Sequence, residues 1–264
     1  MVKILAIGDT VGEPGRHIIE SFIPSMREEE GIDFVVVNGE NIAGGSGLTP
    51  QTSRELFRAG VDCLMSGDHI WDKKEILEVI DQDKRILRPL NYPEGVPGRG
   101  ATVLSSQKGI SVGVINVIGR VFMRENFDCP FKAAEKAAAA LRKETPIILV
   151  DMHAEATSEK IALGWHLDGK VSAIFGTHTH IQTADEKILP KGTAYITDLG
   201  MTGSYDSVLG RDIQQVLGRF LTQMPRRFEV ATDNVQLHGA LFEIDEETGR
   251  ALSVRRIQKK LSCR

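Results

Sequence analysis

The sequence predicts an α/β fold in which strands alternate with helices and the sheets are mixed. Short apolar runs recur along the chain, and a helix-forming segment follows most of them. Two of the runs, 34–37 and 147–150, are apolar without interruption, which indicates strands that are buried on both faces. Segments 101–106 and 110–117 flank a turn at 107–109 and predict a hairpin, so we do not expect a purely parallel sheet.

The first half of the chain predicts strands and helices in turn. Gly and Pro at 12–15 end the first strand, and Pro50 marks the first turn of a helix. Asp72 and Glu75 have the spacing of a capping box, so we expect a short helix there with Asp72 as its cap. The expected strands are 3–8, 34–37 and 61–65, the expected helices are about 15–29 and 50–59, and a surface loop rich in Pro and Gly is expected at 89–100.

The second half continues the pattern and ends in antiparallel strands. An alanine-rich run that follows Pro130 predicts a helix, and the tail alternates apolar and polar residues. The expected helices are 131–143, 157–169 and 211–221, and the expected strands are 147–150, 171–175, 186–189, 193–197, 227–231, 235–245 and 251–260. No repeat, low-complexity segment or linker stands out, so a single domain over residues 1–264 is the economical interpretation.

Composition and charge exclude several classes of protein. Hydrophobic residues make up 41% and charged residues 26%, which is ordinary for a globular protein. The net charge of -4 argues against a broad surface for nucleic acid. Apolar runs are far shorter than the ~20 residues that span a bilayer, and the N-terminus reads as a strand rather than a signal peptide. Cys63, Cys129 and Cys263 have no metal-type spacing, so we expect a reducing, cytoplasmic location.

Polar residues of the kind that bind metals follow five of the predicted strands. Functional sites in open α/β sheets lie outside the carboxyl ends of strands, so we expect these side chains to meet. Two histidines separated by one residue, His178 and His180, are expected on the same side of an extended segment. Both can then approach one ion, or two neighbouring ions. The candidate residues are Asp9, Glu40, Asn41, Asp68, His69, His153, His178 and His180.

The chemistry of this set points to a pair of metal ions. Carboxylates, an amide and imidazoles without cysteine suit Mn, Fe or Zn better than Ca, and they disfavour a structural zinc site. The donors are too many for one ion. Two ions ~3.5–4 Å apart can activate a shared water and neutralise phosphate oxygens together. The residues therefore predict a centre that hydrolyses a phosphoester.

Three short motifs resemble the calcineurin-like metallophosphoesterases. They are GD at 8–9, GDH at 67–69 and GTHTH at 176–180. Three longer strings are similar to one bacterial branch, the YmdB-like 2′,3′-cyclic-nucleotide phosphodiesterases: GENIAGG at 39–45, GRVFM at 119–123 and DMHAEATSEK at 151–160. The resemblance covers essentially the whole chain.

The resemblance implies a four-layer α/β/β/α sandwich with two mixed sheets and two ions, often iron, at one edge. It implies that His69 binds no metal and donates a proton to the leaving 2′-oxygen, while a metal-bridging hydroxide attacks the phosphorus. The implied product is a nucleoside 3′-phosphate. The implied ligands are Asp9, Glu40, Asn41 and His180 for one ion, and Glu40, Asp68, His153 and His178 for the other, with Glu40 bridging.

The sequence departs from the resembled pattern at two positions. The wider superfamily has His where this chain has Val11, and Asn41 is expected to supply the missing donor. The family usually has Asn where this chain has Asp68. The extra negative charge is expected to hold the second ion more tightly and to lower its Lewis acidity, which raises the question of whether activity is preserved.

Each candidate also has an ordinary structural explanation. Asp9 alone reads as a turn cap and His153 alone as a satisfied polar residue, and only the set favours metal binding. Arg120 is either a phosphate contact or a solvated loop residue, and Asp198 with loop 200–203 is a candidate border of the pocket. Trp71 is expected to pack beneath the site. Surface positions or structural roles are expected for His17, His166 and His238.

The leading hypothesis is a phosphodiesterase that acts on a small cyclic nucleotide. A metal-dependent nuclease or phosphomonoesterase would use the same ions, although the net charge of -4 weighs against a nuclease for structured polymers. A regulatory protein that binds a nucleotide or RNA, with low activity, is the alternative from another class. No membrane partner is expected, RNA contact is expected to be weak, and formation of a homo-oligomer stays open.

Overall fold

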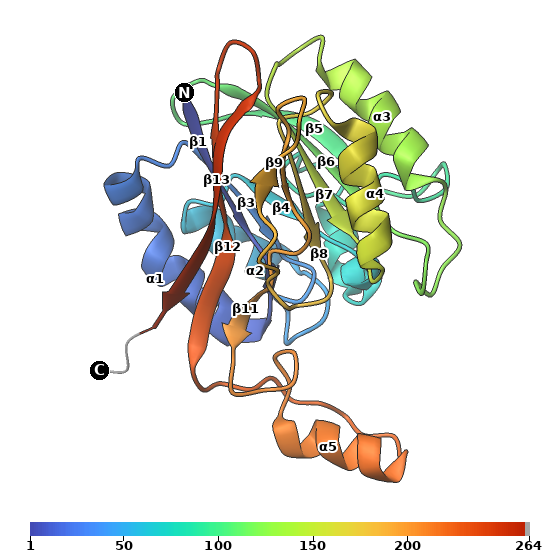
Figure 1. The fold of residues 1–264 in the computed structure, drawn as a ribbon. Helices are drawn as coiled ribbons and strands as arrows, with labels where there is room; N and C mark the ends of the chain where they lie inside the picture. Colours follow the sequence, from blue (N-terminus) through green and yellow to red (C-terminus); the bar gives the residue numbers. More distant parts are fainter. Residues whose placement is uncertain (262–264) are drawn as a thin grey trace.

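Two β-sheets pack face to face in the computed structural model, which describes residues 1–261 (Figure 1). The first sheet has the strand order β2-β11-β12-β1-β3-β4, with β13 paired to β12. The second has the order β5-β6-β7-β8-β10-β9. In the first sheet the strands are β1 (Val2–Ile7), β2 (Asp9–Thr10), β3 (Phe34–Asn38), β4 (Cys63–Met65), β11 (Met201–Ser204), β12 (Val235–Ile244) and β13 (Ala251–Lys260). In the second they are β5 (Ala101–Ser105), β6 (Ser111–Ile118), β7 (Ile148–His153), β8 (Ala173–Thr177), β9 (Lys187–Ile188) and β10 (Ala194–Ile196).

Helices cover the outer face of each sheet, so the chain forms four layers (Figure 1). Helices α1 (Gly12–Glu30) and α2 (Pro50–Arg58) lie on the first sheet, and α3 (Pro130–Leu141) and α4 (Thr157–Leu167) lie on the second. Gly31 ends α1 in the left-handed conformation, and the Thr49 hydroxyl caps α2. The four-layer arrangement expected from the resemblance is present.

Period-two side-chain alternation explains why the central strands read as continuous apolar runs. In β1, Ile4 and Ala6 face the core between the sheets, whereas Leu5 and Ile7 face α1 and α2. Between the sheets, the rings of Phe175 and Phe242 lie 5.9 Å apart. Because both faces of these strands are buried, they need apolar residues at every position.

The parallel strands end at the same edge of the molecule. Strands β1, β3 and β4 are parallel neighbours, as are β6, β7, β8 and β10. The antiparallel strands β12 and β13 complete the first sheet, and the predicted hairpin of β5 and β6 is confirmed. Carboxyl ends from both sheets therefore face one region, where polar side chains can meet.

Several predicted elements differ from the structure. The short strands β2 and β11 were not expected, and 227–231 contains only an isolated bridge between Val230 and Arg211. A 3₁₀ helix, η1 (Asp68–Trp71), follows β4. The next one, η2 (Lys74–Glu78), begins after Lys73 without a side-chain cap, so the prediction that Asp72 caps a helix is wrong. Cys263 lies outside the described residues.

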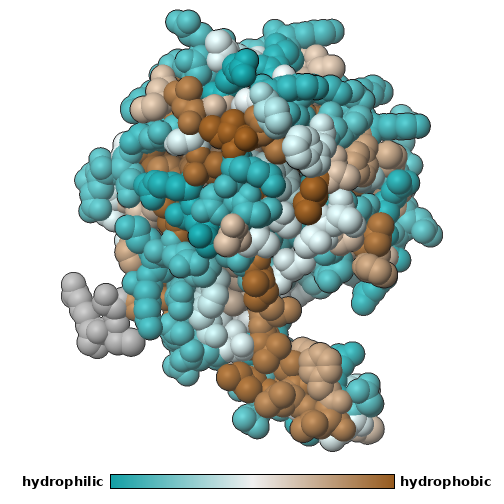
Figure 2. Space-filling model, viewed as in Figure 1, coloured by the Kyte–Doolittle hydropathy of each residue, from teal (hydrophilic) through white to brown (hydrophobic). Residues whose placement is uncertain are grey.

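One helix projects from the body of the molecule. Helix α5 (Ile213–Thr222) lies in the connection between β11 and β12, and among its residues only Val216 is buried (Figure 1). Its apolar side chains are visible as a brown surface at the bottom of Figure 2. Among the described residues, no helix is both long and apolar enough to cross a membrane.

Candidate metal centre

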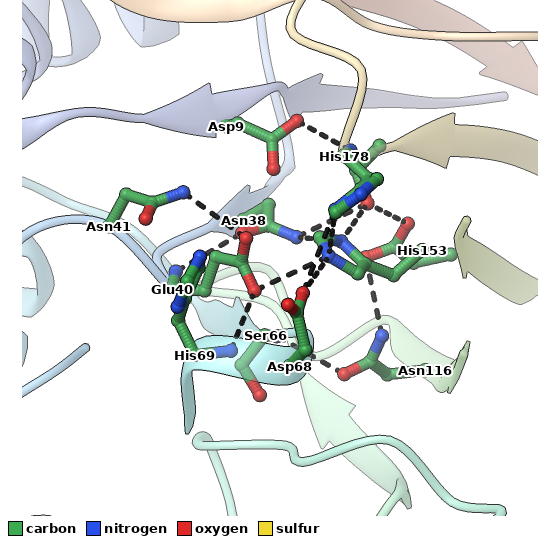
Figure 3. Close-up of polar contacts among 12 residues, drawn as sticks. Asp9, Asn38, Glu40, Asn41, Ser66, Asp68, His69, Asn116, His153 and His178 are labelled. Atoms are coloured by element: carbon green, nitrogen blue, oxygen red, sulfur yellow. Dashed lines mark hydrogen bonds and ion pairs between the residues drawn. The ribbon is translucent and has the colours of Figure 1, made fainter. Parts of the chain in front are cut away.

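The sequence-predicted site residues gather where the two sheets present their carboxyl ends (Figure 3). Asp9 begins β2 directly after β1, and Glu40 and Asn41 follow β3. Asp68 opens η1 after β4. From the second sheet, His153 is the last residue of β7, and His178 follows β8. The first sheet thus contributes the oxygen donors and the second contributes the imidazoles.

Four of these residues form a close group, which we call the His153 cluster: Glu40, Asp68, His153 and His178. Each offers one ligand atom, and the four atoms lie within 4.8 Å of one another. His153 Nε2 lies 3.2 Å from Asp68 Oδ1 and 3.0 Å from His178 Nδ1. Two carboxylate oxygens and two imidazole nitrogens that converge in this way are a donor set for Mn, Fe or Zn. Their role as ligands stays a prediction.

A buried hydrogen-bond chain orients His153. Its Nδ1 lies 2.9 Å from the hydroxyl of Thr177, which donates to Asp151 at 2.9 Å. Since that hydroxyl gives its only proton to Asp151, it can accept one from Nδ1, and this tautomer would leave the lone pair of Nε2 facing the cluster. Burial lowers the pKa of His153 to about 3, so the ring is neutral at pH 7. Sequence reasoning missed Thr177 and Asp151.

The remaining predicted ligands form what we call the His180 group: Asp9, Asn41 and His180. Asp9 Oδ2 accepts a hydrogen bond of 2.9 Å from the backbone N–H of His178, whereas Asp9 Oδ1 is buried without a partner among residues 1–261. His180 Nδ1 is also buried and has no partner within the described part of the chain. Buried polar atoms are nearly always satisfied, so a bound cation would suit these two atoms. By residue type the donor set fits a second ion, although among the described residues only the His153 cluster brings its ligand atoms within 4.8 Å of one another.

Crowded carboxylates give the centre an unfavourable electrostatic balance on its own. Burial, together with the charge of Asp198, raises the pKa of Asp9 to about 7. Burial and the charges of Asp68 and Asp9 raise the pKa of Glu40 well above its usual range. Burial lowers the pKa of His180 to about 4, which leaves a neutral ring. Positive ions would stabilise the carboxylates, and neutral imidazoles are ready to bind them.

The loop that carries the two histidines is bent rather than extended. His178 has a φ of 95° and His180 a φ of 63°, so the expectation that they share one side of an extended segment is wrong. Both rings nevertheless line one cavity of about 330 Å³ with Glu40 and Asn41. Left-handed conformations at such residues cost ~1–3 kcal/mol and are concentrated at functional sites.

A buried ion pair supports the loop that carries His178 and His180. Asp198 accepts a 2.7 Å hydrogen bond from the Thr179 hydroxyl and pairs with Lys160 Nζ at 2.6 Å. Asp198 therefore supports the loop and is not among the residues that line the cavity. Residues of loop 200–203 form most of β11, where Met201 pairs with Asp9 and positions it.

The glycine at position 67 permits the close approach of the ligand-bearing strands. A Cβ at Gly67 would collide with both His153 Nε2 and Glu40 Oε2. Only glycine leaves room for these two side chains to meet beside the backbone. Gly67 is thus required for steric reasons, and it precedes the predicted ligand Asp68.

His69 stands beside the cluster with a partner of its own. Its Nδ1 lies 2.9 Å from Asp72 Oδ2, and the Ser46 hydroxyl lies 3.3 Å from the same nitrogen. Its backbone N–H donates to Glu40 Oε2 at 3.4 Å. With Nδ1 held by Asp72, Nε2 is the nitrogen available to a substrate. Asp72 is thus a positioning residue where the sequence predicted a cap.

His69 also lines two neighbouring cavities. It lines the cavity of the His180 group and a second cavity of about 430 Å³ with Trp71 and Tyr92. Trp71 lines this second cavity and packs edge-on against Tyr92, with ring centroids 6.0 Å apart. The Arg120 side chain is exposed and lines neither cavity, whereas Arg211 lines the first.

The other histidines lie away from the centre. His166 Nε2 lies 3.3 Å from Glu135 at the surface, and His238 stacks on Tyr205 with centroids 4.3 Å apart. His17 lies on the exposed side of α1. These positions agree with the surface or structural roles expected for them.

Comparisons with known proteins agree over nearly the whole chain. The family model described as "YmdB-like protein" matches residues 5–257. The chain is 48% identical to the 2′,3′-cyclic-nucleotide 2′-phosphodiesterase of Bacillus subtilis, over 97% of this chain and 96% of that protein. A solved hypothetical protein from Thermus thermophilus has a TM-score of 0.90 and 41% identity, covering 98% of this chain and 99% of that one. A solved "novel phosphatase" from Mycoplasma pneumoniae has a TM-score of 0.90 and 35% identity, covering 98% and 93%.

Proposed function

The chain belongs to the YmdB-like family and is a phosphodiesterase, and we propose that it opens nucleoside 2′,3′-cyclic phosphates to 3′-phosphates at a pair of metal ions. The observation that carries the proposal is the pairing of the His153 cluster with the His180 group around one cavity. Two sets of donors that Glu40 would bridge suit a reaction in which several phosphoryl oxygens need positive charge at once.

The proposed ligands follow from the two donor sets. Asp9, Asn41 and His180 would hold one ion, the rest of the His153 cluster would hold the other, and Glu40 would bridge them. Iron is the proposed metal, with Mn and Zn as alternatives that use the same donors. When bound, such ions supply Lewis acidity toward the phosphate and make hydroxide available as the nucleophile.

His69 is the proposed proton donor to the departing 2′-oxygen. Its ring lines the cavity beside the cluster, and Asp72 fixes its orientation through Nδ1. A proton on Nε2 then faces the space in which the leaving oxygen would lie. A positioned acid of this kind typically contributes ~10²–10⁴-fold to the rate.

The size of the hollows supports a small substrate. The two cavities that meet at His69 measure about 330 and 430 Å³. These volumes are in the range of small-molecule sites, ~300–1,000 Å³. A mononucleotide with its cyclic phosphate near the ions is the proposed occupant, and the net charge of -4 does not favour a polymer. The proposal keeps the cytoplasmic location, in agreement with the free thiols of Cys63 and Cys129.

Asp68 supports one alternative, a regulatory nucleotide-binding protein with damped activity. The alternatives separate in one assay of the purified protein with Mn or Fe, beside an Asp68→Asn variant. The substrates would be 2′,3′-cyclic AMP, 3′,5′-cyclic AMP, p-nitrophenyl phosphate and a short RNA. We expect both forms to prefer 2′,3′-cyclic AMP and to release 3′-AMP. Turnover by the variant alone would favour the damped protein, and turnover by neither form would refute the proposed reaction.

A further inference from the structure

Arg211 reaches the metal centre from the connection between β11 and β12. These strands pair directly at Ser204 and Val235, so a short turn would be enough to connect them. The connection is instead residues 205–234, which we call the arm. Within the arm, the backbone N–H groups and carbonyls of Val208 and Arg211 exchange hydrogen bonds of 2.9 and 3.0 Å. This tight turn, with Leu209 at a φ of 52°, brings Leu209 and Arg211 into the cavity of the His180 group.

The guanidinium of Arg211 lies against the glycine-rich loop after β3. Its Nη2 donates to the carbonyl oxygen of Gly45. A Cβ at position 45 would collide with the guanidinium, and Gly45 has a φ of 91°. The loop is thus shaped to admit this side chain beside Glu40 and Asn41.

Arg211 has no carboxylate partner among residues 1–261, unlike Arg16 and Arg27. Arg16 pairs with Glu55 at 2.7 Å, and Arg27 pairs with Asp62. The more deeply buried Arg88 donates to the carbonyls of Pro97, Pro89 and Val96. Among residues 1–261, Arg211 donates to a single carbonyl oxygen, that of Gly45. An anion that enters the cavity would therefore stabilise the positive charge of this partly desolvated guanidinium.

We propose that Arg211 binds an anionic phosphoryl oxygen of the substrate and of the 3′-phosphate product. A guanidinium has five N–H donors in a fixed plane, which suits two oxygens of one phosphate, and Gly45 uses only one of them. Arg211 lines the same cavity as Gly45 and His180, which puts this charge beside the predicted ligands but outside the donor set. This inference rests on the proposed function, and it assigns the phosphate contact to Arg211 in place of Arg120.

The test compares Arg211→Ala and Arg211→Lys with Arg219→Ala as a matched control. Arg219 is an exposed arginine of the same arm, 5.6 Å above the ring of Phe228. Calorimetry would measure the dissociation constant of inorganic phosphate from the metal-loaded proteins, and kinetics would give KM and kcat for 2′,3′-cyclic AMP. We expect Arg211→Ala to weaken phosphate binding and to raise KM by about 10–100-fold. Arg211→Lys should recover part of the loss, and Arg219→Ala and the metal content should match the wild type.

Unchanged phosphate binding in Arg211→Ala would overturn the inference. So would a loss of metal in that variant, because Arg211 would then only hold the loop and His180 in place. If the wild type turns over no cyclic nucleotide but Arg211→Ala still loses phosphate affinity, the proposed function fails and the anion site stands. If turnover is present and insensitive to Arg211, the function stands and the anion site fails.

Discussion

The two halves of the candidate centre are built differently. In the His153 cluster, the donors already contact one another, and a chain through Thr177 and Asp151 locks the central imidazole at the end of a strand. In the His180 group, Asp9 Oδ1 and His180 Nδ1 are buried without partners among the described residues. His180 also lies on a loop with a left-handed backbone. One half is thus preorganised by the protein, whereas the buried polar atoms of the other half would be satisfied by the proposed second ion.

The largest effect is expected from Glu40→Gln, because Glu40 is a member of the His153 cluster and the proposed bridge to the ion of the His180 group. The variant removes the charge that would bridge the ions while it preserves the shape of the side chain. We expect both ions to bind more weakly and turnover of 2′,3′-cyclic AMP to fall by about 10³-fold or more. Metal analysis and initial rates would measure this. A variant that keeps both ions and full activity would show that the halves share no ligand.

His69→Ala should separate chemistry from metal binding. We expect the rate to fall by about 10²–10⁴-fold while the metal content is unchanged, since the proposed proton donor lies outside both halves. Asp72→Asn should cost less, about 10–100-fold, because it weakens the hydrogen bond that orients the ring. Loss of metal in His69→Ala would mean that His69 is a ligand. Equal activity of Asp72→Asn and wild type would exclude the positioning role.

Thr177→Val tests whether the His153 cluster is really preorganised. The substitution removes the hydroxyl that lies 2.9 Å from His153 Nδ1 and donates to Asp151. We expect about 10–100-fold weaker affinity for one ion, measured by competition with a chelator. Thr177→Ser keeps the hydroxyl and is the control that should bind as the wild type does. If Thr177→Val and Thr177→Ser bind the ion with equal affinity, the hydrogen-bond chain from His153 through Thr177 to Asp151 does not contribute to ion binding.

The sequence predicted those parts of the molecule that follow from local periodicity. Apolar runs placed the strands, and the carboxyl ends of parallel strands meet at one edge, so the residues that follow them could be grouped without coordinates. The members of the His153 cluster are in this category. The four layers came from the resemblance, because hydrophobic period alone does not say which helix covers which sheet.

What the sequence did not predict depends on contacts between distant segments or on backbone strain. Asp72 fits a capping pattern, and only the turn of η1 shows that its carboxylate reaches His69. The left-handed backbone of His178 leaves no local signal in a non-glycine residue. Arg211 contacts Gly45 across 166 positions, and its arm has no strand pattern that would place it at the cavity.

The number of metal ions per chain is the measurement that decides whether the centre holds a pair of ions. Elemental analysis of protein loaded with Fe or Mn would compare the wild type with His180→Ala. We expect two ions per chain in the wild type. We expect one in the variant, because the His153 cluster keeps its ion when the His180 group loses a ligand. One ion in the wild type, unchanged in His180→Ala, would contradict a paired centre and leave only the His153 cluster as a metal site.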